Sequence, residues 1–449
     1  MKRLFFDFGS TFTKAVLFDI EKRELLAHVQ TPSTVGTDVT EGLFAAIALL
    51  RKKTELTDGE LAAARASSSA AGGLKIAAVG LVPDYTTKAA KTAALGSGGK
   101  VTDTFSFELT NSECRRIEES APDVILLCGG TDGGNKTNIL ANAKKLAELP
   151  AAKNIIVCGN KSARDEAERV FADAKTAANV IFTDNVMPEF GVLNTQGVSA
   201  AIRELFISRI TQAKGIDRVK TVIRDVVMPT PAAVMGAVSL LSRGVRTGEG
   251  FGELMAVDLG GATTDVYSVA DGLPQVPGVH LSGLAEPREK RTVEGDLGLY
   301  HNLDVLAELA GEADEYVAAL KAKLSIPDSE TADTQLRLSR AAVRTAVQRH
   351  CGTRRSVYTA DGTALFQTGK DLTNTELVIG TGGPIAFSGN PGIVLSGAVR
   401  EEADIESLMP KKPGFLIDRE YILFAVGLLG EDEPEAAFEI GARYLERLK

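Results

Sequence analysis

One short pattern occurs twice in this chain, about 250 residues apart: an apolar run ending in an acid, a glycine-rich turn and a second apolar run. The first copy reads "DFGSTFTK" over residues 7–14, and the second reads "DLGGATTD" over residues 258–265. Two apolar runs joined by such a turn are typical of a β-hairpin. Each copy alone is compatible with a surface turn, since short glycine motifs recur by chance. Two copies that open different halves of the chain indicate a pair of facing domains.

The first hairpin carries side chains suited to a phosphate and a cation. Gly9 lets the turn approach a ligand closely, and successive backbone N–H groups can form an anion-binding concavity. Ser10 and Thr11 add hydroxyl donors, and Lys14 on the returning strand can reach a phosphate oxygen. Asp7 at the strand end suits Mg²⁺, which usually keeps several of its waters when it binds protein. The alternative to a phosphate site is a surface hairpin whose aspartate and lysine are solvated.

The second hairpin repeats the same order of residue types. Asp258 ends its strand, and the turn and return strand then supply Gly260, Gly261, Thr263, Thr264 and Asp265. Hairpins of this kind in facing domains would hold an oligophosphate from both sides. Asp7 and Asp258 would then flank a shared metal ion.

A third glycine-rich turn follows an apolar run in "LVIGTGGP", residues 377–384. Gly380, Gly382 and Gly383 would allow a base and its ribose to lie against the backbone at the carboxyl end of the strand. The stretch "LLCGGTDGG" at residues 126–134 is a similar strand exit, so one of the two could be purely structural. We assign the nucleoside to the later turn, because it follows the second hairpin.

The pattern between the two hairpins predicts a different kind of sheet. Apolar runs alternate with amphipathic helical stretches from about residue 76 to residue 183, which is typical of βαβ units and a parallel sheet. We therefore expect an α/β segment, about residues 65–195, inserted in an N-terminal domain of residues 1–250. A C-terminal domain of residues 251–449 would contain a helical segment at residues 303–351.

Composition and missing motifs exclude several classes of protein. A net charge of −9 without a strong basic cluster disfavours nucleic acid as a partner, and the four cysteines form no C-x-x-C pair. No apolar run approaches the roughly 18 residues of a membrane span, and we see no signal peptide, so we expect a cytoplasmic protein without membrane contact. The chain also lacks G-x-x-x-x-G-K-[ST], H-E-x-x-H and G-x-S-x-G. We interpret His350 as a capping or packing residue.

The order of the three turns resembles that of the superfamily of actin, Hsp70 chaperones and sugar kinases. That resemblance implies an α/β fold with two actin-like (ribonuclease H-like) domains and a nucleotide cleft between them. Longer stretches are similar to the family of component L of the glutamate mutase operon, often called MutL and unrelated to the mismatch-repair protein of that name. They are "SSSAAGGLKIAAVGLVPDYTTKAAKTAALGSGGKV", "PDVILLCGGTDGGNKTNIL", "VDLGGATTDVYSV", "RTVEGDLGLYHN" and "LVIGTGGPIA", together with the first hairpin.

This resemblance implies an ATPase that uses ATP and Mg²⁺ to reactivate an adenosylcobalamin-dependent mutase, such as glutamate (methylaspartate) mutase or an aminomutase. It implies that Asp7 and Asp258 are the metal-side acids and that Asp265 lies near the attacking water. Glu294 and Asp296 in "VEGDLG" would orient that water; the alternative for these two is a solvated turn. No cobalamin ligand is expected, because D-x-H-x-x-G is absent. A small-molecule kinase or a filament-forming actin relative remains an alternative, and a homo-oligomer is left open.

Overall fold

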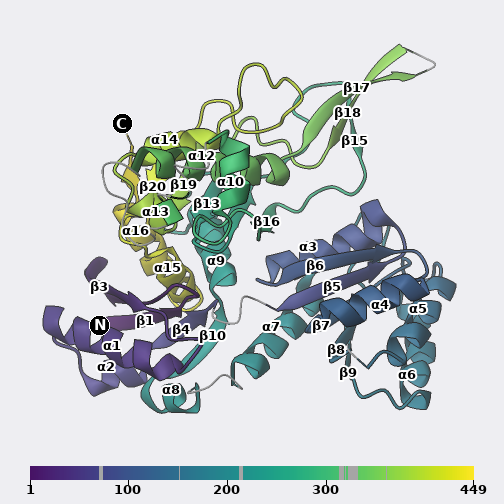
Figure 1. The fold of residues 1–449 in the computed structure, drawn as a ribbon, viewed down its shortest axis with the longest axis horizontal. Helices are drawn as coiled ribbons and strands as arrows, with labels where there is room; N and C mark the ends of the chain where they lie inside the picture. Colours follow the sequence, from purple (N-terminus) through teal and green to yellow (C-terminus); the bar gives the residue numbers. More distant parts are fainter. Residues whose placement is uncertain are drawn as a thin grey trace. The chain divides into compact units, whose positions relative to one another are not determined.

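The computed structural model describes residues 1–69, 74–150, 152–211, 216–312, 318, 320, 321, 332–359 and 362–448. The chain forms two compact units. Unit 1 comprises Met1–Ser69, Lys214–Ser282 and Arg288–Lys449, and unit 2 comprises Ala70–Ala213 and Gly283–Pro287. Both units combine sheets with helices that cover their faces (Figure 1). We describe each unit by itself.

The first sheet of unit 1 has the strand order β10-β4-β1-β2-β3. Its strands are β1 (Lys2–Phe8), β2 (Phe12–Asp19), β3 (Glu24–Pro32), β4 (Arg65–Ser68) and β10 (Asp225–Pro229). Strands β1, β2 and β3 form an antiparallel meander, whereas β4 and β10 run parallel to β1. Helices α1 (Val39–Lys53), α2 (Asp58–Ala62) and α8 (Ile216–Val222) belong to the same half of the unit, and α9 (Thr230–Arg243) follows β10 and packs against elements of both halves.

The second sheet of unit 1 repeats this order as β16-β14-β13-β19-β20, with β21 added at the far edge. Its strands are β13 (Leu254–Leu259), β14 (Thr264–Val269), β16 (Glu289–Glu294), β19 (Leu377–Thr381), β20 (Gly414–Ile417) and β21 (Glu446–Arg447). Again the first three strands are antiparallel and the next two run parallel to the first. This duplicated order confirms the predicted actin-like (ribonuclease H-like) fold class.

Helices and two small sheets complete unit 1. The helices are α10 (Leu303–Ala310), α12 (Ala332–His350), α13 (Gly383–Ala386), α14 (Pro391–Leu395), a 3₁₀ turn (Ser396–Ala398), α15 (Leu423–Gly430) and α16 (Pro434–Tyr444). The small sheets are β15-β18-β17 (Val279–Ser282, Gly362–Thr368, Thr353–Thr359) and β11-β12 (Gly244–Val245, Gly248–Glu249). Helices α10 and α12 lie inside the predicted helical segment 303–351, and most of residues 313–331 between them lie outside the described residues.

Helices α9 and α15 cross at unusually close range in the main core of unit 1. A Cβ added at Gly427 of α15 would lie 1.8 Å from the carbonyl oxygen of Ala233 in α9. Both helices are apolar along most of their length and belong to one buried cluster with strands from both large sheets. Glycine at this crossing is therefore required by backbone contact, and the two halves of unit 1 share a single packed core.

Unit 2 contains a wholly parallel five-stranded sheet with the order β6-β5-β7-β8-β9. The strands are β5 (Lys75–Gly80), β6 (Lys100–Ser106), β7 (Val124–Leu127), β8 (Asn154–Val157) and β9 (Asn179–Phe182). The helices are a π-helical turn (Pro83–Thr87), α3 (Lys88–Gly96), α4 (Asn111–Ser120), α5 (Thr137–Ala147), a 3₁₀ turn (Lys161–Ala163), α6 (Arg164–Asp173) and α7 (Gln196–Thr211). Numbered along the chain, the order is 2-1-3-4-5, that of flavodoxin. The parallel sheet predicted from the alternating pattern is confirmed.

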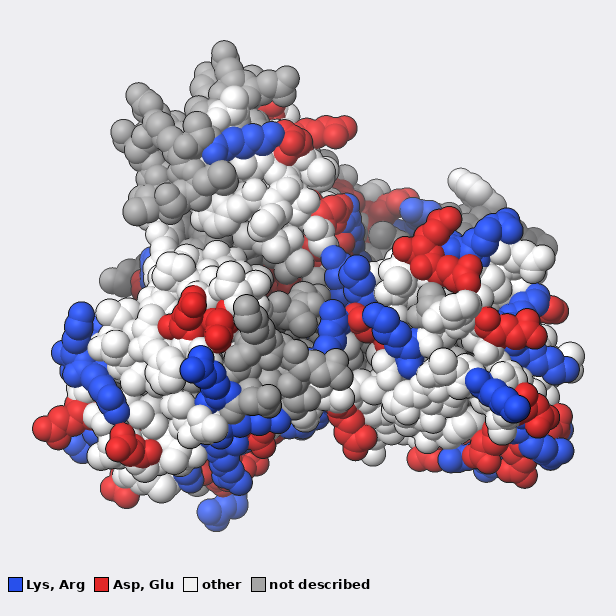
Figure 2. All heavy atoms as spheres, turned by 60° about the horizontal axis from the view of Figure 1, so that its bottom comes forward, with Lys and Arg blue, Asp and Glu red and all other residues white. Residues whose placement is uncertain are grey.

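Surface features are unremarkable for a globular chain. On the face drawn in Figure 2, acidic and basic side chains are interspersed over both units. Within the described ranges, no helix combines the length and the apolar character that crossing a membrane requires.

Candidate functional site

A cavity of about 540 Å³ in unit 1 brings the three sequence motifs together. Thr11 and Lys14 come from the first hairpin, Gly260 and Gly261 from the second, and Gly383 from the third glycine turn. The remaining wall consists of Phe12, Gln30, Tyr300, Ala332, Gln335, Leu336, Ser339, Pro384, Phe387, Ser388, Gly389, Asn390 and Tyr421. Because its lining comes from loops of both large sheets, the cavity is the cleft between the two duplicated halves.

The first hairpin places Asp7 and Lys14 directly opposite each other on β1 and β2. Lys14 Nζ lies 3.1 Å from Asp7 Oδ2 and 3.7 Å from the centre of the Tyr421 ring. The buried Asp7 also accepts hydrogen bonds from the hydroxyls of Ser67 and Thr230. The carboxylate is thus held in one orientation, while the lysine ammonium faces the cavity that it lines.

The second hairpin pairs Asp258 with Asp265 across β13 and β14. Asp265 is buried and forms an ion pair with Arg291, whose Nε donates a hydrogen bond of 2.8 Å to Asp265 Oδ1. Thr263 Oγ1 donates to Asp265 Oδ2. Asp258 differs from Asp265, because no donor in the described part of the chain bonds to its carboxylate.

The third glycine turn packs against Asp258. Thr381 of β19 is the parallel partner of Asp258, and Gly382 follows with a φ of +92°, a conformation that favours glycine. A Cβ at Gly382 would lie 2.2 Å from the Leu259 carbonyl oxygen and 2.7 Å from Asp258 Oδ1. Only glycine allows this turn to lie so close to the acid.

Burial and nearby negative charge raise the pKa of Asp258 to about 7. Burial is the largest cause, followed by the charge of Asp265; Asp7 and Asp418 raise the pKa further, and Lys14 opposes them. A carboxylate without a hydrogen-bond donor, in a cleft with more acids than bases, suits a divalent cation. Among the described residues there is no group of three or more acids, histidines or cysteines placed to share a metal. This donor set fits Mg²⁺, which takes one or two carboxylates and keeps waters and phosphate oxygens as its other ligands.

The remaining predicted residues fall into two groups. Gly9, Ser10, Gly260 and Gly261 form the turns themselves: Gly9 N–H donates to the Phe12 carbonyl, and Gly260 N–H donates to the Thr263 carbonyl. A Cβ at Gly261 would lie 2.7 Å from the Tyr300 ring. These positions therefore border the cavity or shape its rim.

Four predicted residues face away from the cavity or are held by protein partners. Thr264 Oγ1 donates to the Leu297 carbonyl, and Gly380 is buried in β19. Glu294 on β16 is bound by Arg349, which also forms a bidentate pair with Asp296. Arg349 thus bridges the two acids and compensates one of their two charges, and the role of the acids in orienting water stays a prediction.

Several residues of the site were missed in the sequence. Arg291 opens the quoted stretch "RTVEGDLGLYHN" but is given no role there, whereas Asp418 and Tyr421 lie far from the motifs in the chain and nothing local marks them. Asp418 accepts hydrogen bonds from Thr381 Oγ1 and from the N–H groups of Ile422 and Leu423, so it ties the third turn to the start of α15. Tyr421 has a φ of +56°, a conformation that costs a non-glycine residue about 1–2 kcal/mol. Backbone strain of this kind tends to cluster at functional sites.

The fold and the cavity define an actin-like α/β protein with a ligand cleft between duplicated halves. Residues 3–445 match the family model described as "MutL protein", so the chain belongs to this family. The chain is also 42% identical to "Protein MutL" of Clostridium tetanomorphum over 99% of each chain.

Among solved structures, the chain is similar to three proteins at low sequence identity. The first is the ethanolamine utilization protein EutJ from Carboxydothermus hydrogenoformans, at 11% identity and a TM-score of 0.31 over 98% of this chain and 89% of that one. The second is component A of (R)-2-hydroxyglutaryl-CoA dehydratase from Acidaminococcus fermentans, at 10% identity and a TM-score of 0.30 over 98% of this chain and 96% of that one. The third is a xylulose kinase from Rhodospirillum rubrum, at 11% identity and a TM-score of 0.32 over 100% of this chain and 93% of that one.

Proposed function

We propose that the cleft of unit 1 binds ATP and ADP with Mg²⁺ and hydrolyses ATP. The observation that carries the proposal is the meeting of two phosphate-type hairpins and a glycine turn around one cavity, beside an acid with no donor of its own. Lys14 and the turn N–H groups would bind phosphate oxygens. Gly382, Gly383 and the exposed ring of Phe387 would contact the nucleoside.

Asp258 and Asp7 would hold the hydrated cation, which would neutralise phosphate charge. Asp258 is the stronger candidate, since its carboxylate has no protein donor, whereas Asp7 is already bonded to Lys14, Ser67 and Thr230. For Asp265 the ion pair with Arg291 supports a positioning role. The pair holds the Asp265 carboxylate 2.8 Å from a guanidinium nitrogen of Arg291 and so fixes the return strand β14. Thr263 would present its hydroxyl at the same turn.

We further propose that hydrolysis drives reactivation of an adenosylcobalamin-dependent mutase, with glutamate mutase or a related aminomutase as the client. Membership of the MutL family supports this, because the family resemblance implies service to such a mutase. Loss of the γ-phosphate would remove contacts that bridge the two halves of unit 1, and the halves would then change their relative angle. Damaged cobalamin would leave the client during this motion. We place the protein in the cytoplasm, in keeping with the four cysteines, which are all free.

The test is an incubation of the pure protein with Mg²⁺·ATP and a client mutase inactivated by hydroxocobalamin. We expect phosphate release and, on addition of adenosylcobalamin, recovery of mutase activity that depends on ATP hydrolysis. Phosphate release without recovery would contradict the chaperone function. Rapid phosphorylation of an added metabolite would instead support a small-molecule kinase of the same fold. Omission of Mg²⁺ and replacement of ATP by a non-hydrolysable analogue are the matched controls.

A further inference from the structure

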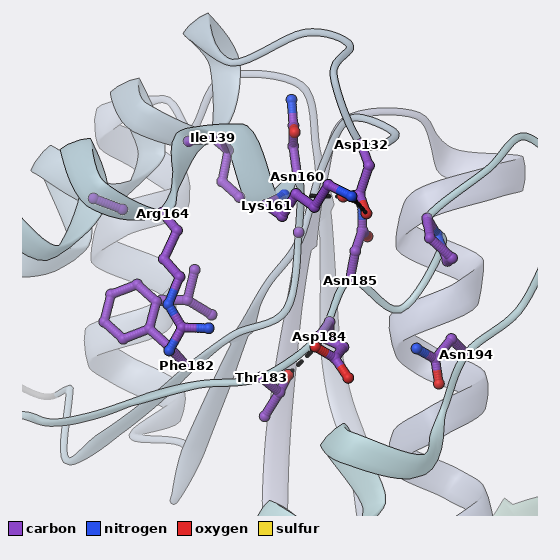
Figure 3. Close-up of a pocket in the computed structure, with 15 residues that line it drawn as sticks. Asp132, Ile139, Asn160, Lys161, Arg164, Phe182, Thr183, Asp184, Asn185 and Asn194 are labelled. Atoms are coloured by element: carbon purple, nitrogen blue, oxygen red, sulfur yellow. Dashed lines mark hydrogen bonds and ion pairs between the residues drawn. The ribbon is translucent and has the colours of Figure 1, made fainter.

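Unit 2 contains a second cavity, of about 220 Å³, that the proposed ATPase does not use. The cavity lies at the carboxyl ends of β7, β8 and β9, and its polar lining comes from the loops that follow these strands (Figure 3). In open parallel sheets with the flavodoxin strand order, the carboxyl edge is where ligands bind. The volume is below the ~300–1,000 Å³ of pockets for drug-sized molecules, so a ligand would be a small metabolite.

Asn160 fixes two of the loops at this edge. Its side-chain oxygen accepts hydrogen bonds from the N–H groups of Gly133 (3.1 Å) and Ser162 (2.9 Å), and its amide nitrogen donates to the carbonyls of Gly134 and Asn135. A Cβ at Gly130, which has a φ of +73°, would lie 2.3 Å from the Asn135 carbonyl oxygen. The glycines of "CGGTDGG" therefore shape this cavity, which gives that stretch a role of its own.

Asp132 and Asn185 fix the third loop. Asn185 Nδ2 donates to the Gly130 carbonyl (3.0 Å) and to Asp132 Oδ1 (2.9 Å), and the same oxygen accepts the Lys161 N–H at 2.9 Å. Asn185 is buried, and its side-chain oxygen accepts the Met187 N–H. The three loops are thus joined by satisfied side-chain hydrogen bonds, so the cavity is held open as a preformed site.

The ionised side chains around the cavity are two acids and two bases. Lys161 Nζ lies 3.7 Å from Asp132 Oδ2, with the lysine side chain 74% exposed, so it is free to reach a ligand. Arg164, the first residue of α6, lies with its guanidinium carbon 5.3 Å from the centre of the Phe182 ring, and its Nε donates to the exposed Glu168 carboxylate at 3.1 Å. The exposed Asp184 carboxylate accepts no hydrogen bond or ion pair from the described residues, and it stands at the end of β9 (Figure 3).

Each base is already held by an acid in an exposed ion pair, Lys161 by Asp132 and Arg164 by Glu168, and pairs of this kind contribute little free energy in water, so a ligand carboxylate can compete for both bases. A ligand with one group of each sign would complement Asp184 with its cationic group and the two bases with its anionic group. The apolar part of the wall, formed by Ile139, Val157, Ala163, Ala167, Phe182 and Pro188, suits a short carbon body.

We propose that this cavity binds a free α-amino acid as its zwitterion. The ammonium group would contact Asp184 and Asp132, the carboxylate would contact Lys161 and Arg164, and the side chain would lie against Phe182. Unit 2 would then be a sensor domain for a small metabolite. The proposal rests on unit 2 alone and is independent of the ATPase assigned to unit 1.

The test is a calorimetric titration of the full chain with each of the 20 standard α-amino acids. We expect saturable binding of at least one of them. Its decarboxylated amine and its 2-hydroxy acid, which each lack one of the two charges, should bind at least tenfold more weakly. The proposal is overturned if none of the 20 binds or if either single-charge analogue binds as tightly as the amino acid.

Matched variants locate the binding. Arg164→Gln and Asp184→Asn should each weaken the amino acid at least tenfold, whereas Arg169→Gln and Asp173→Asn, at exposed positions of α6 outside the cavity, should leave its affinity unchanged. Lys161→Gln alters only an exposed side chain at the rim of the cavity. It serves as the cavity variant if Arg164→Gln or Asp184→Asn lowers the unfolding midpoint of the protein. Unchanged affinity in all three cavity variants would refute the location.

Discussion

Replacement of Asp258 by asparagine should stabilise the metal-free protein while it abolishes ATP hydrolysis. The amide keeps the shape of the side chain but removes a charge that the cleft disfavours. The pKa of Asp258 rises from 3.8 to about 7 in the folded protein. Each pKa unit corresponds to about 1.36 kcal/mol, so the full penalty for ionisation is about 4 kcal/mol. Asp258 is partly exposed in an open cleft, and we therefore expect a gain of about 2–4 kcal/mol.

The gain has a defined pH dependence. Well below pH 3.8 the carboxyl group is protonated in both the folded and the unfolded state, so it does not affect the free energy of unfolding. As the pH rises from about 4 to 7, the unfolded state loses this proton first, and the native state becomes less stable relative to it. Above pH 7 the penalty is constant. The stabilisation by Asp258→Asn should therefore be small at pH 4 and complete at pH 8.

Urea unfolding in EDTA at pH 4 and at pH 8 measures this difference. Asp225→Asn, at an exposed position on β10, is the control and should change the free energy of unfolding by less than ~0.5 kcal/mol. In Mg²⁺ the hydrolysis rate of Asp258→Asn should fall at least ~100-fold, the loss of about 3 kcal/mol of transition-state stabilisation. An unchanged or lower stability at pH 8, or hydrolysis at the normal rate, would refute the reasoning.

Two other perturbations test the core. Gly427→Ala should lower the free energy of unfolding by at least about 1–3 kcal/mol, because its Cβ would lie 1.8 Å from the Ala233 carbonyl oxygen. Gly430→Ala, which meets only the end of a leucine side chain at 3.2 Å, should be tolerated, and equal unfolding midpoints for the two variants would contradict this. Burial and nearby lysines lower the pKa of His350 well below 6.5, so stability should fall as the pH drops below 6.5, by up to ~1.4 kcal/mol per pH unit. His350→Gln should reduce this slope in urea titrations between pH 5 and 7, and an unchanged slope would exclude His350 as its source.

The sequence predicted the architecture well because hairpins and βαβ units leave local signals. Glycines, strand-terminal acids and alternating periods are read from a few adjacent residues, and they predicted the hairpins and the parallel sheet. The actin-like fold class came from the resemblance of the three turns to that superfamily. The interpretation of His350 as a packing residue agrees with its burial and with its ring contacts to Thr292 and Ser268.

The partners of the predicted acids could not be read from the sequence. Asp265 is predicted to lie near the attacking water, and the structure pairs its charge with Arg291 in the neighbouring strand β16, 26 residues away. Glu294 and Asp296 meet Arg349 at the end of a helix more than 50 residues later. Such pairs depend on which strands and helices become neighbours, and one sequence carries no signal for that. The cavity in unit 2 was missed for the same reason, because it needs three loops at once.

The most direct test of the nucleotide cleft is the binding of a fluorescent ADP analogue in the presence of Mg²⁺. We predict one saturable site per chain in the unaltered protein. Gly261→Val should lose at least ~100-fold in affinity, because its side chain would fill the gap between Tyr300 and Thr11. Gly36→Val, in open space with no atom within 4 Å, should bind as the unaltered protein does. No binding to the unaltered protein, or undiminished binding to Gly261→Val, would contradict the assignment of this cleft.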